Sequence, residues 1–129
     1  MTITDEQTAG WSRDKGQSLM TNWLSSGDAP DFVFGNNDEM AIGAIQAMKA
    51  AGIDMKDVVV VGVDATQDAI SSMQAGDMDV TVFQNGGGIG MAALDATLKL
   101  AKGEKVPRLT YVPFELVTPA NMAEFAGKN

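Results

Sequence analysis

The sequence predicts an α/β domain with a doubly wound parallel sheet, and two observations support this prediction. First, residues 32–34 and 58–61 are short, unbroken apolar runs, which are typical of strands buried on both faces of a parallel sheet. Second, an amphipathic helical pattern joins these runs into a βαβ unit, and strand and helix patterns continue to alternate along the chain. Open α/β sheets place their ligands at the carboxyl ends of such strands.

Each element of this architecture is predicted from its own local pattern. Strands are expected where apolar runs end in polar or glycine-containing turns, and helices where apolar residues recur at three- and four-residue spacing. The predicted strands are a short one around Ile3, then 32–34, 58–61 and 80–83, and strand-like pieces at 109–112 and 114–117 separated by Pro113. The predicted helices are 13–24, one that begins within 36–39 and ends at Gly52, 67–75 with Gly76 as its C-cap, 89–102, and 119–126 after Thr118.

The helix at 89–102 differs from the others because apolar residues lie on more than one of its faces. One face carries Ile89, Ala93, Ala96 and Leu100, and another carries Leu94, Leu98 and Ala101. A helix that is apolar around so much of its circumference is expected to be buried against more than one surface. The three glycines at 86–88 are expected to precede it.

Composition limits the functions that are open to the chain. At 129 residues we expect a single α/β domain, 1–129, or part of one, and a net charge of −8 with only nine basic residues argues against a nucleic-acid partner. No cysteine or histidine is present, which excludes disulfides, thiolate metal sites and Ser-His triads. We therefore expect no metal, no cofactor and no enzymatic activity. The first residues lack a signal-peptide pattern, so an exported parent would carry its signal upstream.

Polar side chains follow three of the predicted strands at the points where these strands end. They are Asn36, Asn37 and Asp38 after the first, Asp64 and Thr66 after the second, and Gln84 and Asn85 after the third, with Trp11 in the loop after the strand around Ile3. Carboxylate and amide groups bond pairs of hydroxyls, and an aromatic ring covers the apolar face of a sugar. Because parallel strands end at one edge of a sheet, the sequence predicts a polyol site there.

Other interpretations of the same residues remain open at this point. Either asparagine after the first strand is also a good helix N-cap, with Glu39 completing a capping box. Asp64 would suit a turn, and Trp11 would suit an ordinary, partly buried position. The adjacent acids Asp38 and Glu39 are better explained by the helix dipole than by a pair of catalytic carboxylates.

A glycine motif suggests an alternative function. Gly88, Gly90 and Ala93 fit the G-x-G-x-x-A fingerprint, which follows a strand and opens a helix in dinucleotide sites. A flavodoxin-like or dinucleotide-binding enzyme domain is therefore the alternative. The match is weak, because Glu115 stands slightly too late to be the acid that bonds the ribose.

Several motifs taken together resemble a known family. They are WSRDKG at 11–16, NDEMAIGA at 37–44, VVGVDAT at 60–66, and Gln84 followed by Ile89 and Gly90. Over essentially the whole chain they are similar to the type I periplasmic sugar-binding proteins. The ending TYVPFELVTPANMAEF, at 110–125, is more similar to the inositol-type branch than to the ribose-type branch. The resemblance implies the flavodoxin-like half of a periplasmic-binding-protein type I fold.

The resemblance also implies a function and a set of contacts. Members of this family have two lobes that close on a sugar in the periplasm and pass it to the membrane subunits of an ABC importer. By this resemblance Trp11 stacks on the ligand and Asn37 bonds its hydroxyls. Asp64 takes a hydroxyl pair, and Gln84 bonds from the hinge side. Val63 stands where the ribose-binding pattern has an aromatic residue, so the expected ligand is a ribose- or inositol-like monosaccharide or cyclitol.

Length is the main departure from the family, whose members are much longer than this chain. The resemblance implies a C-terminal portion that lacks most of the N-terminal lobe and the first strand and helix of the C-terminal lobe. Residues 86–117 would normally cross to the missing N-terminal lobe. Because the missing strand lies inside the sheet in the family, its absence is expected to leave unpaired edges and uncovered apolar faces.

We therefore expect a truncated piece that takes one of two courses. It either refolds into a compact flavodoxin-like domain or completes itself with a second chain, as a homodimer or by strand exchange. With half of the cleft absent, weak or no sugar binding is expected. A further alternative is the effector-binding core of a lac-repressor-type regulator, but the 118–122 tail and the acidic balance favour the transport receptor.

Overall fold

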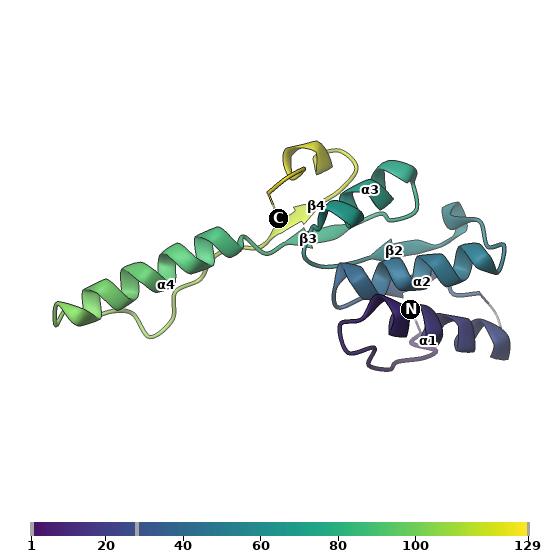
Figure 1. The fold of residues 1–129 in the computed structure, drawn as a ribbon, viewed down its shortest axis with the longest axis horizontal. Helices are drawn as coiled ribbons and strands as arrows, with labels where there is room; N and C mark the ends of the chain where they lie inside the picture. Colours follow the sequence, from purple (N-terminus) through teal and green to yellow (C-terminus); the bar gives the residue numbers. More distant parts are fainter. Residues whose placement is uncertain (1, 28, 129) are drawn as a thin grey trace.

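The chain folds into an α/β body from which one long helix projects (Figure 1). The computed structural model describes residues 2–27 and 29–128. Its elements, in order, are α1 (Arg13–Ser26), β1 (Phe32–Phe34), α2 (Asp38–Ala50), the 3₁₀ turn η1 (Met55–Asp57), β2 (Val59–Val61), α3 (Gln67–Ala75), β3 (Thr81–Phe83), α4 (Gly86–Ala101), β4 (Glu115–Val117) and the 3₁₀ turn η2 (Met122–Glu124). The α/β class and the alternation of strands and helices are confirmed.

The strands pair side by side in the order β1, β2, β3, β4. β1 and β2 are parallel, and a parallel bridge between Val61 and Val80 joins β2 to the start of β3. The amide of Gly62 donates to the carbonyl of Val80 at 2.9 Å, which continues the parallel pairing. β4 is antiparallel to β3, because the chain returns to the sheet after the long excursion through α4.

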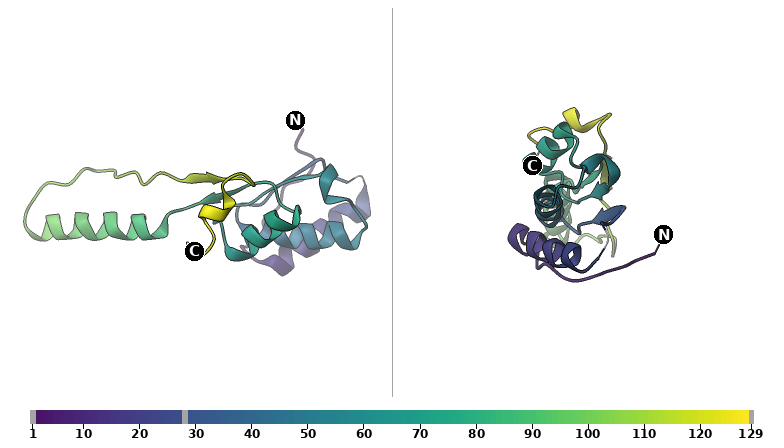
Figure 2. Two further views of the ribbon diagram at one scale, coloured as in Figure 1. Left: turned by 90° about the horizontal axis from the view of Figure 1, so that it is seen from above. Right: turned by 90° about the vertical axis from the view of Figure 1, so that its right-hand side faces the viewer.

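The helices of the body cover one face of this sheet (Figure 2, right). Side chains on the covered face are buried, among them Val60, Phe83 and Val117. On the other face Phe34 is 57% exposed and Val59 is 47% exposed. The expectation that these strands are buried on both faces is therefore wrong for this chain, since no described element covers the second face.

Two glycines bring α1 and α2 into close contact. A Cβ at Gly16 would lie 2.6 Å from the carbonyl oxygen of Met40, and a Cβ at Gly43 would overlap the carbonyl oxygen of Arg13. The backbones can approach only because both positions lack a side chain. This contact fixes the first turn of α1 beside the first turns of α2, at the sheet edge where the strands end.

α4 and the returning residues 102–114 form an extension, which we call the arm (Figure 1 and Figure 2, left). No residue of α4 is buried. The arm's exposed large apolar side chains are Ile89, Met91, Leu94, Leu98, Leu100, Leu109, Tyr111 and Phe114. The expected burial of this helix against more than one surface is thus not found, and the compact refolded alternative is contradicted.

In the described part of the chain two predicted strands do not form, one predicted helix is reduced to turns, and α4 begins earlier than predicted. No strand forms around Ile3, because no neighbouring described strand offers its backbone a partner. α4 begins at Gly86, since Asn85 caps it by accepting from the amide of Gly88 at 2.9 Å. Residues 109–112 form no strand for want of a partner. The predicted helix at 119–126 is only η2 and turns, because the Asn121 side chain bonds the backbone around it instead.

The close approach of α1 and α2 makes a testable prediction. We expect Gly43→Ala to lower the free energy of unfolding by about 1–3 kcal/mol, the usual cost of overpacking. Urea denaturation followed by tryptophan fluorescence measures this change. Gly90→Ala is the control, because its Cβ would meet nothing within 4 Å and alanine favours a helix. Equal effects of the two substitutions would contradict the packing.

Candidate functional site

Polar side chains gather where β1, β2 and β3 end. Asn37 follows β1, Asp64 follows β2 and Gln84 follows β3. Since these strands are parallel neighbours, their carboxyl ends lie at one edge of the sheet. The structure therefore places three of the four predicted contact residues along one edge, as the sequence predicted.

Asp64 and Gln84 are joined directly. The Nε2 atom of Gln84 donates to Oδ1 of Asp64 at 2.7 Å, and the Asp64 amide donates to the carbonyl of Val82 at 2.8 Å. Burial raises the pKa of the Asp64 carboxyl, and the bond from Gln84 opposes that shift. Asp64 also adopts a φ of 121°, which is rare for a residue with a side chain. Its carboxylate is therefore hydrogen-bonded across the edge, besides its place in the turn after β2.

Asn37 serves the fold as well as the edge. Its Oδ1 accepts from the amide of Met40 at 3.0 Å, so the N-cap interpretation is confirmed for this asparagine. Within the described residues no hydrogen bond from its Nδ2 group is found, and the residue is 7% exposed. The capping-box interpretation of Glu39 is wrong, because the third residue of α2 is Met40 and Glu39 pairs elsewhere.

An ion network ties the first turns of α1, α2 and α3 together. Arg13 donates from Nε and Nη2 to both carboxylate oxygens of Glu39, at 2.8 and 2.7 Å, and from Nη2 to Asp68 at 2.6 Å. These bonds raise the pKa of Arg13, so it stays charged. Trp11 lies two residues before Arg13 with a φ of 63°, and it is 67% exposed. Its ring is thus available at this end of α1, and no hydrogen bond links it to the other three residues in the described part of the chain.

Sequence reasoning missed the buried pair Asp38 and Thr81. Both are fully buried, and the Thr81 hydroxyl donates to Oδ1 of Asp38 at 2.6 Å. Burial raises the pKa of Asp38, mainly by desolvating its carboxylate. The helix dipole would lower that pKa. The dipole alone is therefore an insufficient explanation for an acidic residue at this position. The available signal was a lone hydroxyl, Thr81, in an otherwise apolar strand.

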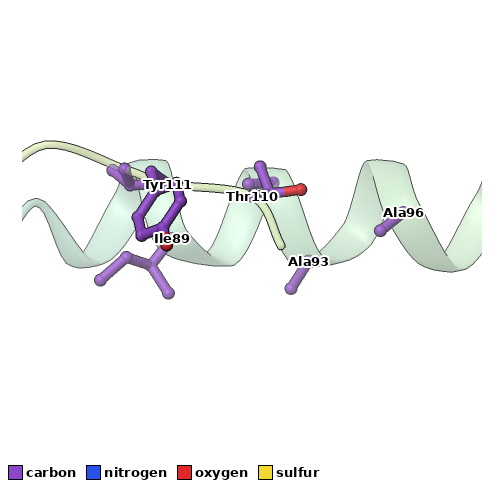
Figure 3. Close-up of a pocket in the computed structure, with 7 residues that line it drawn as sticks. Ile89, Ala93, Ala96, Thr110 and Tyr111 are labelled. Atoms are coloured by element: carbon purple, nitrogen blue, oxygen red, sulfur yellow. The ribbon is translucent and has the colours of Figure 1, made fainter. Parts of the chain in front are cut away.

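A hollow of the surface lies elsewhere, on the arm. It has a volume of about 410 Å³ between α4 and residues 110–112, and Figure 3 shows Tyr111 beside Ile89 across it. Its lining residues are Ile89, Ala92, Ala93, Ala96, Thr110, Tyr111 and Val112. No charged or amide side chain lines this hollow, so it lacks the groups that would orient a polar ligand.

The dinucleotide alternative loses its structural basis. Gly88, Gly90 and Ala93 all lie inside α4, whereas the fingerprint needs its first glycines in the turn between strand and helix. Among the described residues no group of three or more acidic, histidine or cysteine side chains could hold a metal ion. No helix within this part of the chain is both long and apolar enough to span a bilayer.

The sequence of the chain is similar to several known proteins. Residues 1–105 match the family model described as periplasmic binding protein domain. The putative rhizopine-binding protein of Rhizobium meliloti is 61% identical over 98% of this chain and 41% of its own length. The ribose import binding protein of Bacillus subtilis is 34% identical over 90% of this chain and 37% of its own length. The chain therefore spans less than half the length of these relatives.

Solved structures give the same picture. A solute-binding protein of an ABC transporter from Bacillus halodurans, with bound myo-inositol, superposes with a TM-score of 0.89 at 44% identity over 99% of this chain and 44% of that one. The Caulobacter myo-inositol binding protein, also with myo-inositol, gives a TM-score of 0.87 at 35% identity over 96% and 43%.

The raised pKa of Asp64 predicts a pH-dependent effect of Asp64→Asn. In the folded chain this carboxyl holds its proton to a higher pH than its ordinary value of 3.8. Its contribution to stability is therefore greatest below that value and falls as the pH rises through the raised pKa. The amide can still accept from Gln84 and never ionises.

We expect Asp64→Asn to equal the parent chain in stability at low pH and to exceed it increasingly as the pH rises through this range. Urea denaturation at a series of pH values measures the difference. Asp57→Asn, at an exposed carboxylate before β2, is the control for the loss of one negative charge. A difference that shrinks with rising pH would contradict the direction of the shift.

Proposed function

This chain belongs to the periplasmic binding protein domain family, and from that membership we propose that it presents one wall of a binding site for a neutral polyol, a monosaccharide or cyclitol. The observation that supports this most is the bonded pair of Asp64 and Gln84 beside Asn37 at one edge of the sheet. These groups offer amide donors and a carboxylate acceptor, which together suit adjacent hydroxyls.

Each residue of the edge has a role in this proposal. Asp64 accepts from two neighbouring hydroxyls of the ligand, and Gln84 orients it by donating to Oδ1. Asn37 donates through Nδ2, because its Oδ1 is committed to capping α2. Trp11 supplies an exposed ring that covers the apolar face of the ligand.

A cyclitol is the preferred ligand within this class. Two of the similar structures, at 44% and 35% identity, hold myo-inositol. Val63 lies in the turn after β2, immediately before Asp64. An aliphatic residue here suits a different ligand ring from the sugar ring that an aromatic residue would flank. We therefore place myo-inositol ahead of ribose.

Partners and location follow from the family rather than from the edge itself. The family is one of periplasmic solute-binding proteins and not of enzymes. We propose that a full-length parent works in the periplasm and delivers its ligand to the membrane subunits of an ABC importer. The acidic balance of the chain argues against nucleic acid as a partner.

Titration of the labelled chain with myo-inositol, ribose and xylitol, followed by ¹H–¹⁵N NMR, tests this function. One wall alone should bind weakly, with a dissociation constant of about 1 mM or weaker. We expect myo-inositol to shift the side-chain amides of Asn37 and Gln84 more than ribose does. Asp64→Ala should abolish these shifts, and Asp57→Asn should preserve them.

Two results would contradict the proposal. One is the absence of any shift at Asn37 and Gln84 at high ligand concentration. The other is a response confined to the hollow on the arm, reported by Tyr111.

We further propose that the chain pairs with a second copy through the arm and the uncovered sheet face. The chain exposes 8265 Å². A compact monomer of 13.5 kDa would expose about 6,500 Å², so the excess is about 1,700 Å² per chain. Two copies that hid this excess from each other would bury about 3,400 Å², which lies in the range of obligate homodimers.

Light scattering after size exclusion, over a wide range of concentrations, measures this association. We expect a dimer for the parent chain. Leu98→Lys should dissociate it, because Leu98 is an exposed apolar residue of the arm. Thr97→Lys adds the same charge at the neighbouring polar position and should leave the dimer intact. A monomer at every concentration, or open-ended larger oligomers, would contradict a closed pair.

A further inference from the structure

The turn after β2 has an unfavourable backbone conformation for its residues. Asp64 and Ala65 both have positive φ, at 121° and 54°, although neither is a glycine. Such conformations persist only where the surroundings determine them, and they concentrate at ligand sites. Other contacts must therefore hold this turn, because positive φ is unfavourable for two consecutive residues that carry side chains.

Two successive amides of the turn lead to one carboxylate. The amide of Thr66 donates to Oδ2 of Asp38 at 2.8 Å. The amide of Ala65 donates to Oγ1 of Thr81 at 3.1 Å, and that hydroxyl in turn donates to Oδ1 of Asp38 at 2.6 Å. Asp38 is the first residue of α2 and is fully buried. No Lys or Arg side chain pairs with it in residues 2–27 and 29–128.

The backbone that precedes the turn also lies close to the Asp38 carboxylate. A Cβ at Gly62, the residue after β2, would overlap Oδ1 of Asp38, so a side chain here would displace the carboxylate. The amide of Asp38 also donates to the carbonyl of Val63 at 2.8 Å. Backbone on both sides of Asp64 is thus bonded to Asp38, whereas Asp64 itself points its carboxylate to Gln84.

We propose that Asp38 is the positioning residue of this edge: it holds Asp64 and Ala65 in their positive-φ conformation and so directs the Asp64 carboxylate toward Gln84. The ligand role of Asp64 rests on the function proposed above. The effect of Asp38 on the turn does not, and it can be measured without any ligand.

The test reads the conformation of Ala65 by NMR in the labelled chain. A residue with positive φ gives an intense NOE between its own amide and Hα protons. We expect Asp38→Ala to lose this signal at Ala65. Asp38→Asn should retain it, because the amide oxygen still accepts from Thr66 and the amide nitrogen can donate to Thr81. Glu39→Gln, which removes the neighbouring charge in the same helical turn, should leave the signal unchanged.

A second variant covers the case in which Asp38→Ala does not fold. Thr81→Val keeps the volume but removes the hydroxyl that joins Ala65 to Asp38, so it should also weaken the Ala65 signal. Dispersed methyl signals from Ile70 and Val117, in the core, report that each variant is folded. If folded Asp38→Ala or Thr81→Val keeps the intense Ala65 NOE, the proposal is overturned. Loss of the signal in both Asp38→Asn and Glu39→Gln would overturn it too, because it would indicate that the charges at the helix N-terminus, and not the hydrogen bonds of Asp38, hold the turn.

Titration with myo-inositol separates this inference from the function on which it rests. Asp38→Ala should raise the apparent dissociation constant by about tenfold or more, the scale known for residues that orient the ligands of a metal site. Asp38→Asn should restore most of the affinity. If the turn collapses in Asp38→Ala but the parent chain binds no polyol, the positioning role stands and the proposed function fails. If the parent binds and Asp38→Ala binds equally well, the positioning role fails alone.

Discussion

The buried carboxylate of Asp38 is the constraint on which the edge of the sheet depends. It joins the start of α2 to β3 through Thr81 and to the start of α3 through Thr66. A carboxylate without a cationic partner is costly to bury, and the raised pKa of Asp38 reflects that cost. The hydrogen bonds offset part of this burial cost. They also hold the strand ends at the edge in one arrangement.

The body buries many of its apolar side chains, whereas the helix of the arm buries none. In the body, the glycine contacts between α1 and α2 and the single covered face of the sheet enclose the core around Met48 and Ile70. The arm has no such enclosure, and α4 buries none of its residues. Its exposed large apolar side chains are the ground on which the pairing with a second copy is proposed.

Much of the body could be predicted from sequence because its signals are local. The helix at Gln67–Ala75 with its Gly76 cap was predicted with the bounds that the structure shows, and so was the strand at Phe32–Phe34. The failures are of another kind. Whether 109–112 becomes a strand depends on a partner strand, which no local pattern reveals. Likewise Asn121, read as part of a helix, bonds the backbone of Thr118 and Leu116 instead.

The candidate site divides in the same way. Asn37, Asp64 and Gln84 could be placed at one edge because parallel strands end together, and the structure places them there. Their link to Asp38 could not be foreseen, because Asp38 and Thr81 lie 43 positions apart in the chain. The proposed function depends on the role of this edge in binding a polyol.

Intermolecular NOEs between myo-inositol and the labelled chain test that role most directly. We expect contacts from the ring protons to Trp11 and to the side chains of Asn37 and Gln84. Contacts only to Ile89 and Tyr111 on the arm would contradict it.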